Sequence, residues 1–169
     1  MTDRAAQLAA KLIRNVEGQE GREVRRDPLY EGKLVRLTPD TPATKMGATY
    51  CELAPGEGRR VCPYHLHHAQ EEMFVILEGK GTLRVAAEHL PVRKGDVIFT
   101  PAGPDYPHQL INASDQPLKY LAISTKETPE ICEYPDSGKF LAEASLDHAT
   151  PFEVIDRRGE SKDYWDGEP

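Results

Sequence analysis

The sequence predicts an all-β fold with one short N-terminal helix, and two observations carry this prediction. From Lys33 onward, short runs rich in Val, Ile, Thr, Tyr and Phe are separated by turns that contain Gly or Pro. The 169 residues include 13 Gly and 14 Pro, which favours many tight turns between short strands over long helices. The length suits one domain with short extensions.

The apolar runs define the strands of a sandwich or barrel. We expect strands near residues 33–38, 46–54, 60–67, 72–78, 81–86, 89–92, 96–100, 107–113 and 118–125. Turn signals such as Glu78-Gly79-Lys80-Gly81 favour antiparallel pairing in sequence order. In that pairing, a hairpin around Gly56 places Cys51 opposite Cys62, both as small buried hydrophobes.

Residues outside this strand-rich region are expected to form extensions. We assign residues 1–32 to an N-terminal helix and arm, residues 33–125 to the barrel, and residues 126–169 to a C-terminal loop and tail that pack on the barrel. The helix follows from the helical spacing of apolar residues between Ala5 and Val16, with Thr2 available as N-cap and Gly18 just past the end.

Composition and charge exclude several function classes. Lys and Arg number 21 and Asp and Glu 28, so the net charge is −7, which disfavours nucleic acid as a partner. No apolar run approaches the length of about 18 residues that a membrane span needs. Three cysteines without a CxxC pair are a poor disulfide framework, and the N-terminal stretch lacks the apolar core of a signal peptide. We therefore expect a cytoplasmic protein.

The segment His65-Leu66-His67-His68-Ala69-Gln70-Glu71-Glu72 is typical of a metal site. Residues two apart in a strand share a face, so His65 and His67 point the same way. A tight turn then returns Glu72 to the same place, where its carboxylate adds an oxygen donor to two nitrogens. Glu71 is the alternative carboxylate, but it faces the other way in a strand, and His68 is out of phase with His67.

A second segment complements the first. It runs from Gly95 through Pro101 and Gly103, and it continues to Tyr106, His108 and Asn112. Together the two segments resemble the two sequence motifs of the cupin superfamily. The residues that match motif one are Gly58, His65, His67, Glu72 and Gly79, and those that match motif two are Gly95, Pro101, Gly103, His108 and Asn112. The spacing from Gly58 to His65 is one residue longer than usual, and that from Gly103 to His108 is two residues longer. More narrowly, the chain resembles small single-domain bacterial cupins of the mannose-6-phosphate-isomerase-like or sugar-phosphate-isomerase type.

This resemblance implies a double-stranded β-helix, a jelly-roll-like barrel with a metal at its mouth. The implied ligands are His65, His67, Glu72 and His108, and they suit one divalent transition metal, namely Zn, Mn, Fe, Ni or Co. We expect Glu72 to be catalytic as well. Tyr106 is the expected substrate-binding residue because it lies beside His108 in the sequence.

The expected function is that of an isomerase-like, metal-dependent enzyme that acts on a small sugar or sugar phosphate. Two alternatives stay open, an Fe(II)-dependent dioxygenase and a non-catalytic cupin that binds a small ligand. No phosphate anchor is evident, because the basic residues are spread along several strands. We also expect a homodimer, since exposed sheet edges and the apolar stripe of the helix both need covering.

Overall fold

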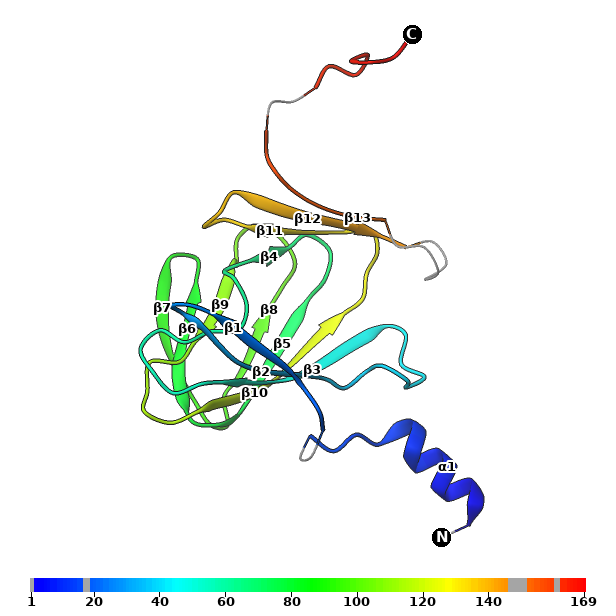
Figure 1. Ribbon diagram of the computed structural model, residues 1–169, viewed down its shortest axis with the longest axis vertical. Coiled ribbons are helices and arrows are strands. Elements are labelled where there is room, and N and C mark those ends of the chain that lie inside the picture. The colour runs from blue at the N-terminus through cyan, green and yellow to red at the C-terminus, as the bar shows by residue number, and fades with distance from the viewer. Residues whose placement is uncertain (1, 17–18, 146–151, 160–161) are drawn as a thin grey trace.

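Short strands with alternating burial form three antiparallel sheets in the computed structural model, which describes residues 2–16, 19–145, 152–159 and 162–169 (Figure 1). The elements are α1 (Asp3–Leu12), β1 (Arg22–Arg26), β2 (Tyr30–Arg36), β3 (Met46–Leu53), β4 (Leu66–His67), β5 (Glu72–Glu78), β6 (Lys80–Val85), β7 (Glu88–Arg93), β8 (Val97–Thr100), β9 (His108–Ile111), β10 (Leu118–Thr125), β11 (Glu130–Tyr134), β12 (Lys139–Ala144) and β13 (Phe152–Arg157). Strands β3, β10 and β5 are neighbours in space but not in sequence, so the pairing in sequence order expected from the turn signals is wrong for this sheet. Crossovers of this kind are typical of jelly-roll-like barrels.

The largest sheet has six strands in the order β1-β2-β3-β10-β5-β8. A four-stranded sheet has the order β13-β12-β11-β4, and a three-stranded sheet has the order β7-β6-β9. Buried side chains from β3, β5, β6, β7, β9 and β10 form one continuous core. This core includes Leu53, Ile76, Leu83, Leu110 and Leu118.

The inner face of the six-stranded sheet changes from apolar to polar along its length. Tyr120 of β10 lies opposite Cys51 of β3 on one side and Ile76 of β5 on the other. Four residues further along β10, Ser124 lies opposite Glu72 on β5. Because cross-strand partners share a face, Glu72 and Ser124 extend the inward row that the core residues begin. The polar end of this row is where the candidate site lies.

Helix α1 forms locally and packs on no core. Thr2 caps it as expected, with its Oγ1 accepting a hydrogen bond from the Ala5 N–H at 3.3 Å. The helix ends at Leu12 and not near Val16, because Ile13 has extended backbone angles. Gly18, the expected stop, lies outside the described residues. None of the residues of α1 is buried, and the helix stands apart from the strands (Figure 1).

No helix in the described residues has the length and apolarity to cross a membrane.

The structure corrects one expected strand. Residues 60–67 form only the two-residue strand β4 and isolated bridges at Arg60 and His65. Pro63 has no N–H to give to a ladder, which explains the interruption. The expected hairpin is therefore absent, and β3 pairs with β2 and β10 instead. Cys51 lies opposite Leu34 and Tyr120, and it is buried with a free thiol as predicted.

The structure also adds strands where the sequence indicated arms and loops. Strand β1 has only Val24 partly buried among charged residues, so it lacks apolar alternation. Strands β11, β12 and β13 occupy the region expected to be loop and tail. In β11 the charged residue is buried and its apolar neighbour is not: Glu130 is buried, whereas Ile131 is 42% exposed. All six residues of β13 are exposed. The division of the chain at residues 33 and 125 remains an expectation.

Candidate metal centre

The four side chains expected to bind metal meet at the polar end of the barrel. His65 and His67 belong to the segment of β4, where His65 forms an isolated bridge with His108 at the start of β9. Glu72 begins β5 on the neighbouring sheet. The bridge brings motif one and motif two into direct backbone contact, with His65 N donating to His108 O at 3.1 Å and His108 N donating to His65 O at 2.7 Å.

One carboxylate oxygen lies at the centre of this group. The Oε2 atom of Glu72 is 2.8 Å from Nε2 of His108, 3.4 Å from Nε2 of His65 and 3.5 Å from Nε2 of His67. The donor atoms of His65, His67 and Glu72 all lie within 4.8 Å of one another. Glu71, the alternative carboxylate, is exposed. Glu72 thus has the position that motif spacing indicated.

The second ring nitrogen of each histidine faces an acceptor. Nδ1 of His65 lies 2.9 Å from the carbonyl oxygen of Pro63, and Nδ1 of His108 lies 3.0 Å from that of Tyr106. Nδ1 of His67 lies 3.2 Å from Oε1 of Glu130. Carbonyl and carboxylate oxygens only accept hydrogen bonds, so each Nδ1 carries a proton. In the neutral rings the lone pair then lies on Nε2, and all three Nε2 atoms face Glu72.

This donor set fits a divalent transition metal. Three nitrogen lone pairs and one ionised carboxylate converging on one point repel each other unless a cation balances them. The cation can be protons on the imidazoles or a metal ion bound by all four groups. Imidazole nitrogens with one carboxylate oxygen suit the metals that the sequence indicated, Zn, Mn, Fe, Ni and Co.

The pKa shifts reflect the same crowding. Burial by itself would raise the pKa of Glu72, but the imidazoles of His108, His65 and His67 outweigh it and hold the pKa well below its usual range. Burial would lower the pKa of His67, but Glu72 and Glu130 outweigh it and raise that pKa above the usual 6.5. The centre therefore attracts positive charge.

Glu130 is a site residue that sequence analysis missed. Its side chain is 2% exposed, and its carboxylate accepts hydrogen bonds from the backbone N–H groups of His68, Ala69 and Gln70 at 2.9–3.0 Å. These bonds fix the turn between β4 and β5, while Oε1 also holds the ring of His67. In the sequence, Glu130 directly precedes Ile131 and Cys132. The alternation of apolar and polar residues does not predict that an acidic residue is buried there.

A cavity of about 200 Å³ adjoins the histidines. Its lining is part apolar and part polar, and it consists of Cys62, Pro63, His65, His67, Gln70, Glu130, Cys132, Tyr134, Leu141 and Glu143. We call it the inner cavity. No Lys or Arg belongs to this described lining. Half of it comes from β11 and β12, the strands that the sequence did not indicate.

The side chains of Tyr106 and His68 lie outside the centre. The side chain of Tyr106 is exposed, and its backbone carbonyl faces His108. Tyr106 is not among the lining residues of the inner cavity, so its substrate-binding role stays a prediction. The ring of His68 turns outward, with Nε2 lying 2.7 Å from Oε1 of Glu133. That contact links β4 to β11 at the surface.

Comparisons with known proteins agree with this geometry. The cupin domain family matches residues 49–124, which include all four side chains at the centre. An uncharacterized protein of Methanocaldococcus jannaschii is 40% identical over 73 residues, covering 41% of this chain and 57% of that protein. A glucose-6-phosphate isomerase of Pyrococcus abyssi is 30% identical over 110 residues, covering 59% of this chain and 49% of the isomerase.

Solved structures extend the likeness to most of the chain. A crystal structure of a sugar phosphate isomerase of the cupin superfamily from Silicibacter pomeroyi superposes with a TM-score of 0.72 at 22% identity. The alignment covers 85% of this chain and 91% of that protein, so the likeness extends beyond the matched domain. At this identity the likeness establishes the fold. The match identifies residues 49–124 as a cupin domain, and the structural likeness shows that the chain has the cupin fold.

Proposed function

We propose that this chain binds one divalent transition metal through His65, His67, Glu72 and His108 and isomerises a small sugar in the inner cavity. The observation that carries the proposal is the convergence of three Nε2 lone pairs on an ionised carboxylate beside a cavity of about 200 Å³. A metal bound there supplies Lewis-acid polarisation of a carbonyl and its neighbouring hydroxyl. The similarity to a glucose-6-phosphate isomerase supports the choice of reaction class.

Glu143 is the side chain that we assign to proton transfer. It lies on β12 directly opposite Glu130 and lines the same cavity. Glu130 is committed to three backbone N–H groups and His67. Burial raises the pKa of the Cys62 thiol to about 11 and that of the Cys132 thiol to about 12, and it also raises the pKa of Tyr134, so these groups keep their protons at neutral pH. Glu143 is left as the available base.

Isomerisation of an α-hydroxy aldehyde to a ketose balances with one carboxylate. Glu143 removes the proton from the carbon that bears the hydroxyl and returns it to the former carbonyl carbon. The hydroxyl proton moves to the former carbonyl oxygen, so no external oxidant or reductant is needed. Glu72 keeps its negative charge throughout and holds the histidines in place.

The test is turnover of metal-loaded protein in D₂O, followed by NMR with a panel of aldoses, ketoses and their phosphates. The expected result is interconversion of one aldose–ketose pair with deuterium entering the carbon next to the carbonyl. An unchanged panel together with O₂ consumption in the presence of Fe(II) would overturn the proposal in favour of a dioxygenase. Thermal stabilisation by a panel member or a small dicarboxylate without any turnover would favour a binding protein.

We also propose that the chain acts in the cytoplasm as a homodimer. Large apolar side chains are exposed on β13, at the edge of its sheet, including Phe152 and Ile155, and at the end of α1, including Leu12 and Ile13. A second copy that covered these surfaces would remove an exposed sheet edge. The free thiols of Cys51, Cys62 and Cys132 suit a reducing compartment. Light scattering that gave a single species of 18.9 kDa would contradict the dimer.

A further inference from the structure

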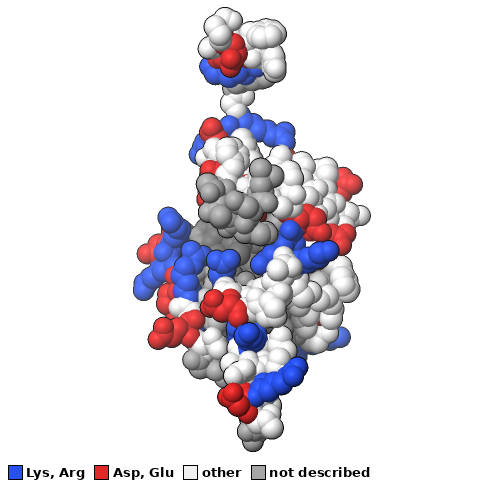
Figure 2. Space-filling model, turned by 90° about the vertical axis from the view of Figure 1, so that its right-hand side faces the viewer, with Lys and Arg blue, Asp and Glu red and all other residues white. Residues whose placement is uncertain are grey.

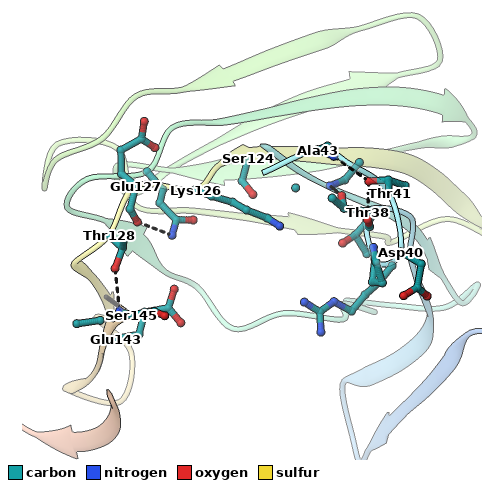
Figure 3. A pocket seen from close by; sticks show the side chains of 17 residues that line it. Thr38, Asp40, Thr41, Ala43, Ser124, Lys126, Glu127, Thr128, Glu143 and Ser145 are labelled. Atoms are coloured by element: carbon teal, nitrogen blue, oxygen red, sulfur yellow. Dashed lines mark hydrogen bonds between the residues drawn. The ribbon is translucent and has the colours of Figure 1, made fainter. Parts of the chain in front are cut away.

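A second cavity, of about 560 Å³, adjoins the inner cavity. We call it the outer cavity. The two share Gln70 and Glu143 in their linings, so these residues form the boundary between them. The outer cavity lies beside the loop between β2 and β3 and is lined on its other sides by the end of β10 and by β12 (Figure 3).

One row of cross-strand partners connects the outer cavity with the metal centre. Glu72 on β5 lies opposite Ser124 on β10, and Ser124 lies opposite Gly47 on β3. Ser124 and Gly47 line the outer cavity. Neighbouring strands are about 4.8 Å apart, so Gly47 is about 10 Å from Glu72 across the sheet. The row therefore gives the direction from the centre to the outer cavity, which shares Gln70 and Glu143 with the cavity beside the histidines.

Two cationic side chains line the outer cavity, Arg36 from β2 and Lys126 from the end of β10. Across the described parts of the chain, neither has an ion pair with a carboxylate within 4.0 Å. Both Lys126 and Ser124 lie against Gly47, because a Cβ there would be 3.5 Å from Cε of Lys126, an ordinary contact, and 3.0 Å from Oγ of Ser124, a tight one. Figure 3 shows Lys126 extending into the space between Ser124 and the turn at Thr38.

Hydroxyl groups accompany these cations. Ser124, Thr38 and Thr41 line the same cavity. Oγ1 of Thr38 accepts a hydrogen bond from the Ala48 N–H at 2.7 Å, which leaves its own hydroxyl proton free to donate. Although the chain has a net charge of −7, Lys and Arg side chains gather across the middle of the face that carries the β2–β3 loop (Figure 2).

Three carboxylates also line the outer cavity, and their places restrict where an anion can bind. Glu127 directs its carboxylate away from the centre of the cavity, and Asp40 lies at the opposite end from Glu127, below Thr41 in this view (Figure 3). Glu143 is at the boundary with the inner cavity. An anionic group is therefore favoured between Lys126, Arg36 and Ser124, and a neutral, hydroxylated group is favoured beside Glu143.

We propose that the outer cavity binds the phosphate of a sugar monophosphate whose carbonyl end occupies the metal centre. The placement of the carbonyl end at the metal centre rests on the function proposed above. In an extended hexose 6-phosphate, seven bonds separate the carbonyl carbon from phosphorus, which at about 1.2 Å per bond is about 8 Å. That length matches the row from Glu72 to Gly47. Arg36 supplies a planar fork for two phosphate oxygens, and Lys126 supplies a point charge.

Binding of inorganic phosphate tests the outer cavity without any turnover. Line broadening in ³¹P NMR is compared for the wild type, Lys126→Gln, Arg36→Gln and a matched control, Lys94→Gln, which removes an exposed charge in another turn. We expect each cavity variant to weaken phosphate binding at least about tenfold, with the control unchanged. His67→Ala should leave phosphate binding intact, because that residue belongs to the metal centre. Wild-type binding that Lys126→Gln and Arg36→Gln do not alter, or no phosphate binding at all, would overturn the inference.

A kinetic arm separates this inference from the proposed function. If a sugar phosphate is isomerised, Lys126→Gln should raise its KM at least about tenfold while leaving kcat/KM for the unphosphorylated sugar unchanged. An equal loss for both sugars would overturn the phosphate assignment. If no sugar is isomerised while phosphate binding still depends on Lys126 and Arg36, the proposed reaction fails and the anion site stands.

Discussion

Glu130 Oε1 lies 3.2 Å from Nδ1 of His67, although the two residues are 63 positions apart in the sequence. The same carboxylate holds the turn that leads from β4 to Glu72. A single buried side chain from β11 thus orients one histidine and sets the path of the chain to the carboxylate at the centre. The candidate centre therefore depends on a strand outside both of its motifs.

Glu130→Gln should weaken metal binding about 10–100-fold, because the neutral amide no longer polarises the His67 ring or matches three N–H donors. The dissociation constant, measured by competition with a chromogenic chelator, gives the size of the effect. Glu88→Gln, an exposed substitution on β7, is the control and should bind metal as the wild type does. Equal affinity in Glu130→Gln and wild type would show that Glu130 only shapes the turn.

Glu143→Gln should lower turnover about 10²–10⁴-fold with metal content unchanged, since the amide cannot carry the proton. Elemental analysis and the NMR isomerisation assay measure the two quantities on the same sample. A variant that keeps wild-type turnover would contradict the role of Glu143. Glu88→Gln again serves as the matched control, because it removes the same charge far from either cavity.

Metal affinity should fall as the pH decreases, starting above pH 6.5. The neutral imidazole is the metal ligand, and Glu72 and Glu130 raise the pKa of His67 above its usual 6.5 despite burial. Protons therefore compete for this ring at a higher pH than they would for a free histidine. Chelator competition at several pH values between 5.5 and 8 follows the change. A dissociation constant independent of pH over this range would exclude histidine ligation.

Cys62 should react slowly with iodoacetamide although it lines the inner cavity. Burial and then the charge of Glu72 raise its pKa from 9.0 to about 11. The thiolate fraction at pH 7.5 is then about one hundredth of that of an unshifted thiol, and the thiolate is the reactive form. Mass spectrometry of the labelled peptide measures the rate. Labelling of Cys62 as fast as a small-molecule thiol would contradict the shift.

Gly79→Ala should destabilise the fold more than Gly138→Ala. Both positions have positive φ, +85° and +63°, so both variants incur a backbone cost of about 1–2 kcal/mol. At Gly79 an added Cβ would also lie 2.3 Å from the Pro117 carbonyl oxygen, whereas nothing lies within 4 Å at Gly138. Denaturant unfolding of the two variants compares the free energies. Equal losses would mean that the chain at Pro117 moves aside freely.

Local sequence patterns indicate three of the four side chains that meet at the centre. His65, His67 and Glu72 lie within eight residues, and strand periodicity with one tight turn already brings them together. His108 came from the resemblance of the second segment to the cupin motif. The structure brings these side chains to one carboxylate oxygen because β4 and β9 meet at the His65–His108 bridge.

The rest of the site depends on burial that hydropathy does not indicate. Glu130 is buried while its neighbour Ile131 is exposed, so the pattern of β11 opposes the usual alternation. Glu143 lines both cavities and Lys126 lines the outer one only because strand pairing brings distant segments together. Pro63 likewise interrupts a segment whose composition favours a strand. Such features follow from tertiary context and not from local sequence.

The residues of the centre come from three different sheets. His67 lies on the four-stranded sheet, Glu72 on the six-stranded sheet and His108 on the three-stranded sheet. An ion bound by all of them fastens the sheets together, so global unfolding must release it. At free metal of about 100 times the dissociation constant, this linkage adds about 2.7 kcal/mol of stability. The melting temperature of this protein would then report the free metal concentration around it, and a chelator would act on it as a denaturant does.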